Sequence, residues 1–155
     1  MNAKTKSTVK DLDLKRYMGL WYEIARFENR FEKDLVAVTA RYTFMPDGKI
    51  EVINSGRVKT LNGVLKSSKG KAKQPDPKRP GELKVSFFLW FYADYDILLL
   101  DQKNYSYALI GSNSDKYLWI LSRTPRIDDG TLNFILNYAR KLGYDTSKLY
   151  YTPQP

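Results

Sequence analysis

The feature that most constrains this chain is a series of short segments in which apolar and polar residues alternate, each joined to the next by turn-forming residues. This period-2 pattern predicts β-strands that bury one face. Within residues 36–44, for example, Val38, Ala40 and Tyr42 share a face, and Pro46-Asp47-Gly48 then predicts a hairpin turn. Eight such strands in up-and-down order predict a closed antiparallel barrel, because closure removes the exposed sheet edges.

The spacing of apolar residues changes after Arg123. Asp128 and Asp129 precede a stretch in which Leu132, Ile135, Leu136 and Ala139 recur at helical intervals. The pattern predicts one α-helix at about 128–142, packed on the outside of the barrel. Residues 1–10 are rich in Lys, Thr and Ser and are expected to form a flexible arm before a single barrel domain at 11–155.

Two residue types are missing from the sequence, cysteine and histidine. Their absence excludes disulfides, Ser-His-Asp catalysis and ligation of zinc or haem by His or Cys. Acidic residues such as Glu23, Asp96 and Asp101 have no spacing that pairs them for catalysis. We therefore expect no enzyme activity, no cofactor and no metal site.

The net charge is +9, from 26 basic and 17 acidic residues. Lysines and aromatic residues fall on opposite faces of most predicted strands, which argues against a nucleic-acid-binding barrel. No apolar run approaches the ~18 residues needed to span a bilayer. Residues 1–10 lack the apolar region of a signal peptide, and the sequence has no cysteine for lipidation. The sequence as given predicts a soluble chain without an export signal.

Three stretches of the chain resemble the lipocalin family, especially its bacterial and apolipoprotein D-like members. They are Gly19-x-Trp21 continuing as WYEIARF to Phe27, LKVSFF at 83–88, and LWILSRTP at 118–125. The resemblance covers about residues 14–152 and implies an all-β fold, an eight-stranded up-and-down barrel with one C-terminal helix outside. It also implies that Arg123 lies across the ring of Trp21 at the closed end, as a cation–π pair.

Alternate residues of each strand face the interior of a small barrel. The parity set by Trp21 and the apolar faces predicts a ligand-binding lining made of Val38, Ala40, Tyr42, Val52, Asn54, Val85, Phe87, Leu99, Ile110, Trp119 and Leu121. In apolipoprotein D-like lipocalins, the positions that match Tyr42, Asn54, Trp119 and Leu121 line the pocket. The small residues Ser68, Gly70 and Ala72 are expected to leave space inside.

An apolar lining with few polar groups predicts a small hydrophobic ligand, a fatty acid or a lysophospholipid. Arg30, Lys33 and Lys66 are candidates for holding its head group. The resemblance implies lipid storage or transport at the cell envelope, at the outer membrane or in the periplasm. The aromatic stretch 88–92 leaves peripheral membrane contact and a homodimer open. A structural or protein-binding barrel with a filled core is the alternative.

Overall fold

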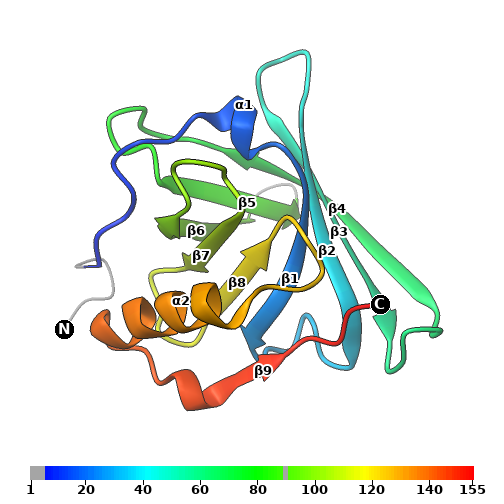
Figure 1. The fold of residues 1–155 in the computed structure, drawn as a ribbon. Helices are drawn as coiled ribbons and strands as arrows, with labels where there is room; N and C mark the ends of the chain where they lie inside the picture. The colour runs from blue at the N-terminus through cyan, green and yellow to red at the C-terminus, as the bar shows by residue number, and fades with distance from the viewer. Residues whose placement is uncertain (1–5, 89–90) are drawn as a thin grey trace.

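A computed structural model of the chain describes residues 6–88 and 91–155. Eight antiparallel strands form one sheet that closes where β1 pairs with β2, and a ninth strand adds to the second half of β1 (Figure 1). The strands are β1 (Gly19–Phe27), β2 (Leu35–Phe44), β3 (Ile50–Val58), β4 (Leu65–Lys73), β5 (Glu82–Phe88), β6 (Phe91–Leu100), β7 (Tyr107–Gly111), β8 (Leu118–Ser122) and β9 (Leu149–Tyr151). The predicted up-and-down barrel is confirmed.

Three helical elements accompany the barrel. α1 (Leu14–Tyr17) begins at Asp13, whose carboxylate accepts from two backbone N–H groups. α2 (Asp129–Lys141) falls within the predicted range 128–142 and is capped by Asp128. A 3₁₀ turn, η2 (Thr146–Lys148), leads into β9. No helix in the described part of the chain has the length and apolar composition to cross a bilayer.

The two ends of the barrel differ. α1 lies across one end, next to the loops that connect β2 to β3, β4 to β5 and β6 to β7; we call it the closed end (Figure 1). The β1–β2 loop (28–34), the β3–β4 loop (59–64) and the β7–β8 loop (112–117) lie at the opposite end, which we call the mouth. β1 runs from the closed end to the mouth.

Apolar side chains form two separate clusters. The first lies inside the barrel around Trp21, which is completely buried, and includes residues of β2 to β8. The second lies between the barrel wall and α2, where Ile135 and Ala139 are completely buried. The amphipathic helix therefore covers the outside of the barrel, as the sequence predicts.

Register shifts in several strands change which residues face inward. In β6 a shift between Ile97 and Leu99 leaves Ile97 in the inner cluster, while Leu98 and Leu99 both pack in the cluster under α2. The expected inward position of Leu99 is therefore wrong, because one extra residue in a strand reverses the alternation beyond it. A shift at Glu23 and Ala25 acts in the same way in β1.

Part of the predicted flexible arm is attached to the barrel. The amide of Val9 donates to the carbonyl of Ile97 (2.9 Å), and the Val9 side chain packs on the inner cluster. Val9, which the sequence places in the arm, therefore contacts the barrel. Residues 1–5 lie outside the described residues, as do 89–90 and all side chains at 88–91, on which the expectations for the aromatic stretch 88–92 rest.

Replacing Ile135 by Ala should lower the free energy of unfolding by about 2–5 kcal/mol, because its fully buried side chain fills the space between α2 and the barrel. Urea denaturation measures the change. Phe134→Ala on the same helix is the control, since Phe134 is 54% exposed and its loss should cost about 1 kcal/mol or less. Equal losses for the two variants would contradict this packing.

Candidate functional site

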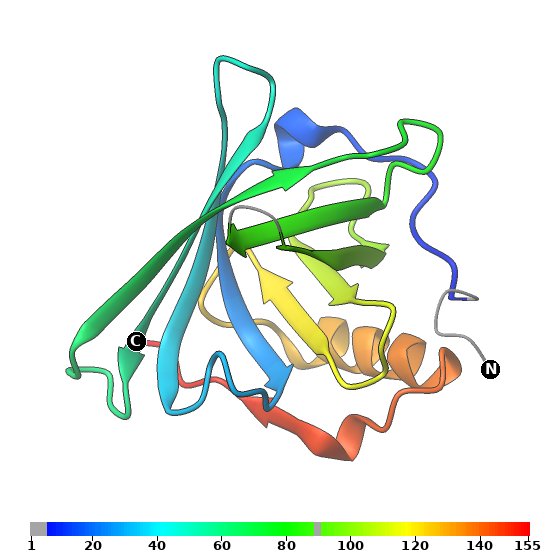
Figure 2. The same ribbon diagram turned by 180° about the vertical axis from the view of Figure 1, so that it is seen from behind.

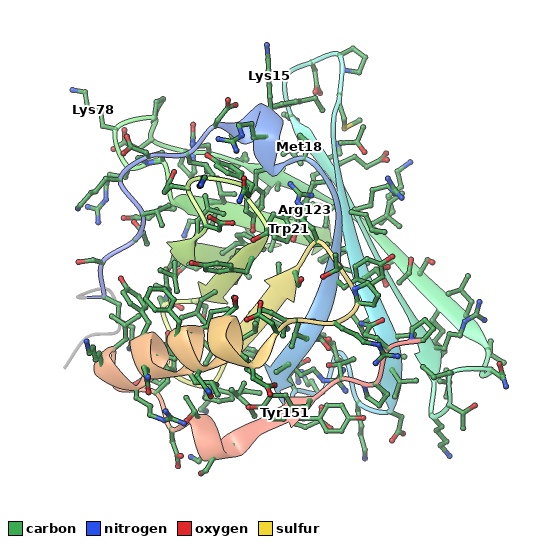
Figure 3. All side chains as sticks on the ribbon, in the orientation of Figure 1. Lys15, Met18, Trp21, Lys78, Arg123 and Tyr151 are labelled. Atoms are coloured by element: carbon green, nitrogen blue, oxygen red, sulfur yellow. The ribbon has the colours of Figure 1, made fainter. Side chains whose placement is uncertain are left out.

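The closed end is fastened by Arg123 and Trp21. The guanidinium carbon of Arg123 lies 3.8 Å from the centroid of the Trp21 ring (Figure 3). Its nitrogens donate to the backbone carbonyls of Arg16 (2.6 Å), Leu20 (3.1 Å) and Tyr105 (3.1 Å). One cation thereby joins the N-terminal segment, β1 and the β6–β7 loop, and the implied cation–π contact is present.

Three tyrosines form a hydrogen-bonded layer above Trp21, inside the barrel. The Tyr95 hydroxyl lies 2.7 Å from that of Tyr17 and 2.8 Å from that of Tyr42. The Tyr17 ring packs against Trp21 with a centroid distance of 5.0 Å, and the Trp21 indole N–H donates to the Tyr17 carbonyl (2.9 Å). Burial raises the pKa of Tyr42 to about 12 and that of Tyr17 and Tyr95 well above their usual value.

Part of the interior wall keeps accessible surface. Val52 (2% exposed), near the closed end, and Ile110 (1%), which pairs directly with Trp119, are buried. By contrast, five inward-facing residues on five strands are only partly buried: Ala40, Asn54, Val85, Tyr95 and Trp119. The interior wall is therefore closely packed at some positions and accessible at others, among them Trp119.

The structure brings most of the predicted lining together. Eight of the predicted residues belong to the inner cluster or pair directly with it: Ala40, Tyr42, Val52, Asn54, Val85, Ile110, Trp119 and Leu121. Val38 is buried, and its side chain lies next to Gly56 of β3. Leu99 alone packs outside the barrel, under α2.

The ring of Phe87 lies in the space beside Gly70. A Cβ on Gly70 would lie 2.6 Å from a ring carbon of Phe87, so the ring occupies the room that the missing side chain leaves. Ala72 is buried, and Ser68 is exposed because β5 does not extend that far. The row of small residues thus accommodates Phe87 and provides less free volume than the sequence suggests.

Asn54 is the polar group of this wall without a partner. Its strand neighbour Ala40 faces the interior, and directly paired residues share a face. Among residues 6–88 and 91–155, no hydrogen bond to the Asn54 side chain is formed. The sequence suggested Tyr42 as its partner, but the Tyr42 hydroxyl is bound to Tyr95 instead.

A buried ionic network near the mouth was missed by the sequence reasoning. Arg26 (1% exposed) donates to the Glu23 carboxylate (3.0 Å), which also accepts from Thr152 (2.5 Å). The indole N–H of Trp119 donates to the Glu32 carboxylate (2.6 Å). The one available signal was Glu23, a carboxylate on the same alternating face as Trp21; the shift that follows it in β1 leaves no mark in the sequence.

This network shifts the pKa of Glu23. Burial and the neighbouring Glu32 carboxylate raise the pKa of Glu23 well above its usual value, although Arg26 opposes the shift. Arg26 itself keeps its charge, with its pKa raised by Glu23. Arg26 also donates to the carbonyls of Glu32 (2.9 Å) and Leu35 (3.0 Å), so it holds the β1–β2 loop against the barrel.

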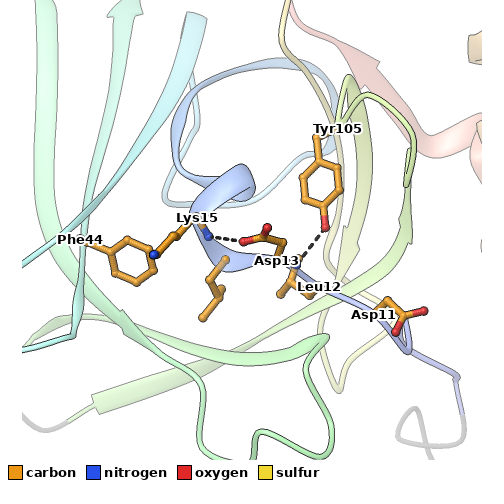
Figure 4. A pocket seen from close by; sticks show the side chains of 7 residues that line it. Asp11, Leu12, Asp13, Lys15, Phe44 and Tyr105 are labelled. Carbon is orange, nitrogen blue, oxygen red and sulfur yellow. Dashed lines mark hydrogen bonds between the residues drawn. The ribbon is translucent and has the colours of Figure 1, made fainter.

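A shallow depression at the closed end lies outside the barrel, beside α1 (Figure 4). Its lining includes Leu12, Phe44 and Tyr105, and the amide of Asp13 donates to the Tyr105 hydroxyl (2.9 Å). It is open to solvent. No group of three or more acidic side chains suited to a metal ion is present in the described residues.

A closed up-and-down barrel with one external helix and an Arg over the Trp of its first strand defines the class of small ligand-binding β-barrels. The lipocalin-like domain model matches residues 12–154, and the chain belongs to the lipocalin family. Binding of small hydrophobic molecules is typical of this family.

Similar proteins come from several kingdoms. Outer membrane lipoprotein Blc of Escherichia coli is 44% identical over 149 residues, which cover 96% of this chain and 83% of that protein. Temperature-induced lipocalin-1 of Arabidopsis thaliana is 42% identical over 160 residues (97% and 84%). Insecticyanin from the tobacco hornworm Manduca sexta has a similar structure, with a TM-score of 0.75, 25% identity and coverage of 96% and 84%.

Replacing Arg123 by Ala should destabilise the fold by about 2–5 kcal/mol, because three backbone carbonyls lose a charged donor and Trp21 loses its cation. Lysine at this position should restore only part of the loss, since it lacks the planar fork of donors. Urea denaturation measures both variants. Arg126→Ala, at an exposed neighbouring position, is the control and should change stability little.

The tyrosine layer predicts a loss of stability at alkaline pH. Folding raises the pKa of Tyr42 from about 10 to about 12, so the neutral phenol is favoured in the folded state. The stabilisation is fully present below pH 10 and decreases as the pH rises from about 10 to about 12. Unfolding in urea across this range should have a smaller pH dependence in Tyr95→Phe. The exposed Tyr151→Phe variant should retain the dependence of the original protein.

Proposed function

We propose that the protein binds and carries a fatty acid or a lysophospholipid inside its barrel, for storage or transport of lipid at the cell envelope. The observation that carries this proposal is the accessible, mostly apolar part of the interior wall. A filled structural barrel would bury these residues as completely as it buries Val52 and Ile110.

The chemistry of the wall supports a long hydrocarbon chain. Ala40, Val85, Phe87 and the ring of Trp119 offer apolar surface, and each methylene removed from water contributes roughly 0.8 kcal/mol. Ordering of the ligand and of the mouth offsets much of this gain, so micromolar affinity is expected. The tyrosine hydroxyls are already bonded to one another, so the end of the chain, not a charged group, fits against them.

Polar groups suited to a head group lie nearer the mouth. Asn54 has an amide without a partner among the described residues, and a ligand oxygen would satisfy it. Arg30, Lys33 and Lys66 are exposed at the mouth, where a carboxylate or phosphate would emerge. The acyl chain therefore enters first and the head group stays near solvent.

The relatives support the location at the envelope and the role of carrier. Three of the similar proteins are described as outer membrane lipoproteins, from Vibrio cholerae, Escherichia coli and Citrobacter freundii. Among residues 6–88 and 91–155 no interior nucleophile lies beside a base, and the carboxylates of Glu23 and Glu32 near the mouth are held by Arg26 and Trp119. We therefore propose transport without catalysis.

Native mass spectrometry after incubation with oleate or with oleoyl lysophosphatidylethanolamine tests the proposal. One added ligand mass is expected. Ala40→Phe should abolish ligand binding, because the larger side chain occupies the space inside the barrel beside residue 40. Thr39→Phe, whose side chain lies on the opposite face of β2, should retain ligand binding. Asn54→Leu should weaken binding about five-fold, the value of one hydrogen bond.

Binding by Ala40→Phe at the original affinity would place the ligand elsewhere and contradict the proposal. Failure of the original protein to bind any lipid class would favour a barrel with a structural or protein-binding role. Loss of binding in both phenylalanine variants would indicate a disturbed β2, and thermal unfolding of each variant identifies that case.

A further inference from the structure

Large apolar side chains are exposed together at the mouth. They are Val64 (72% exposed), Phe31 (65%), Leu65 (55%) and Leu61 (39%). Phe31 belongs to the β1–β2 loop and the other three to the end of the β3–β4 hairpin. The two loops are joined, because the amide of Lys59 donates to the carbonyl of Asp34 (2.6 Å). We call these four side chains the apolar rim.

The β3–β4 hairpin projects beyond the neighbouring strands. β4 pairs with β3 from Leu65 to Ala72, but it pairs with β5 only from Lys71 to Lys73. In Figure 2 the hairpin extends past the ends of β5 and β6. All residues from 65 to 69 are exposed. The apolar rim is therefore the part of the mouth that first meets a surface approaching from this end.

The same hairpin is strongly basic. Residues 50–73 contain six basic side chains and one acidic one, Glu51, which pairs with Lys69 (3.2 Å). Lys59 and Lys66 flank the apolar rim on the hairpin, and Arg30 lies over the Phe31 ring at 5.1 Å. The exposed acidic groups of the β1–β2 loop are Glu28, which accepts from Arg26, and Asp34.

A second copy of the chain fits this surface poorly. The free edge of β4 carries Lys66 and Lys69, and pairing of two such edges would bring like charges together. An anionic lipid surface can contact both the apolar rim and the lysines that flank it. Apolar side chains enter the boundary between head groups and acyl chains, and lysines contact the lipid phosphates.

We propose that the apolar rim and its flanking cations dock the mouth of the barrel on an anionic lipid membrane. The docking surface is the outside of the β3–β4 hairpin and Phe31, and it does not depend on what the interior binds. Docking would place the mouth, and with it Trp119 and Asn54, against the lipid surface, where a single-chain lipid can pass without crossing water.

Co-sedimentation with lipid vesicles tests the proposal. The protein should bind vesicles of phosphatidylcholine containing one quarter phosphatidylglycerol, bind pure phosphatidylcholine much more weakly, and lose affinity as salt shortens the Debye length to about 8 Å and below. Val64→Glu/Leu65→Glu and Lys59→Glu/Lys66→Glu should each lower vesicle affinity about ten-fold or more.

Two matched controls carry the same changes away from the mouth. Phe134→Glu alters an exposed apolar residue on α2, and Lys49→Glu/Lys78→Glu reverses two exposed lysines at the closed end. Both should bind within about two-fold of the original protein. An equal loss in the lysine control would indicate attraction by net charge alone and overturn the docking surface.

Two further results would also overturn the proposal. One is equal binding to both kinds of vesicle. The other is absence of vesicle binding together with a dimer in solution that Val64→Glu/Leu65→Glu abolishes, which would assign the rim to a second copy. Lipid binding by the rim variants in native mass spectrometry reports on the interior alone, so failure of docking and failure of the carrier function are distinguishable.

Discussion

The contact between Arg123 and Trp21 determines how the closed end is built. A guanidinium keeps its charge when partly buried and offers five donors in one plane. Here it satisfies carbonyls from three segments while its face covers the indole. Gly19 allows the chain to enter β1 at this point, because its φ of +101° is a conformation that other residues rarely adopt. β1 thus starts, and the β6–β7 loop ends, at this cation.

Much of the fold follows from patterns visible in the sequence. The alternation from Gly19 to Phe27 coincides with β1, and the helical spacing after Asp128 coincides with α2. The inward face could be assigned only where a strand keeps its alternation. At Leu99 one extra residue reverses the faces, and such a shift is set by the neighbouring strands, which a single sequence does not reveal.

Tight packing for stability and accessible surface for a ligand are conflicting requirements, and different parts of the barrel interior meet them. Near the closed end the rings of Trp21, Tyr17 and Tyr42 are tightly packed, and their polar atoms bind one another, so this half stabilises the fold. At Ala40, Val85 and Trp119 the wall is accessible, and Asn54 has no partner among the described residues. The Asn54 amide is only partly buried, so solvent reaches it in the empty barrel and a ligand oxygen can replace that solvent on binding.

The buried Arg26 connects the interior with the outer surface of the mouth. It holds the β1–β2 loop through the carbonyls of Glu32 and Leu35, and Glu32 in turn binds the indole of Trp119. Because Lys59 is bonded to the same loop, the β3–β4 hairpin and Phe31 keep a fixed relative position. A rim whose backbone is held in place loses less conformational entropy when it meets a surface. The network around Arg26 inside the barrel thus helps to position the loops that carry the apolar rim outside it.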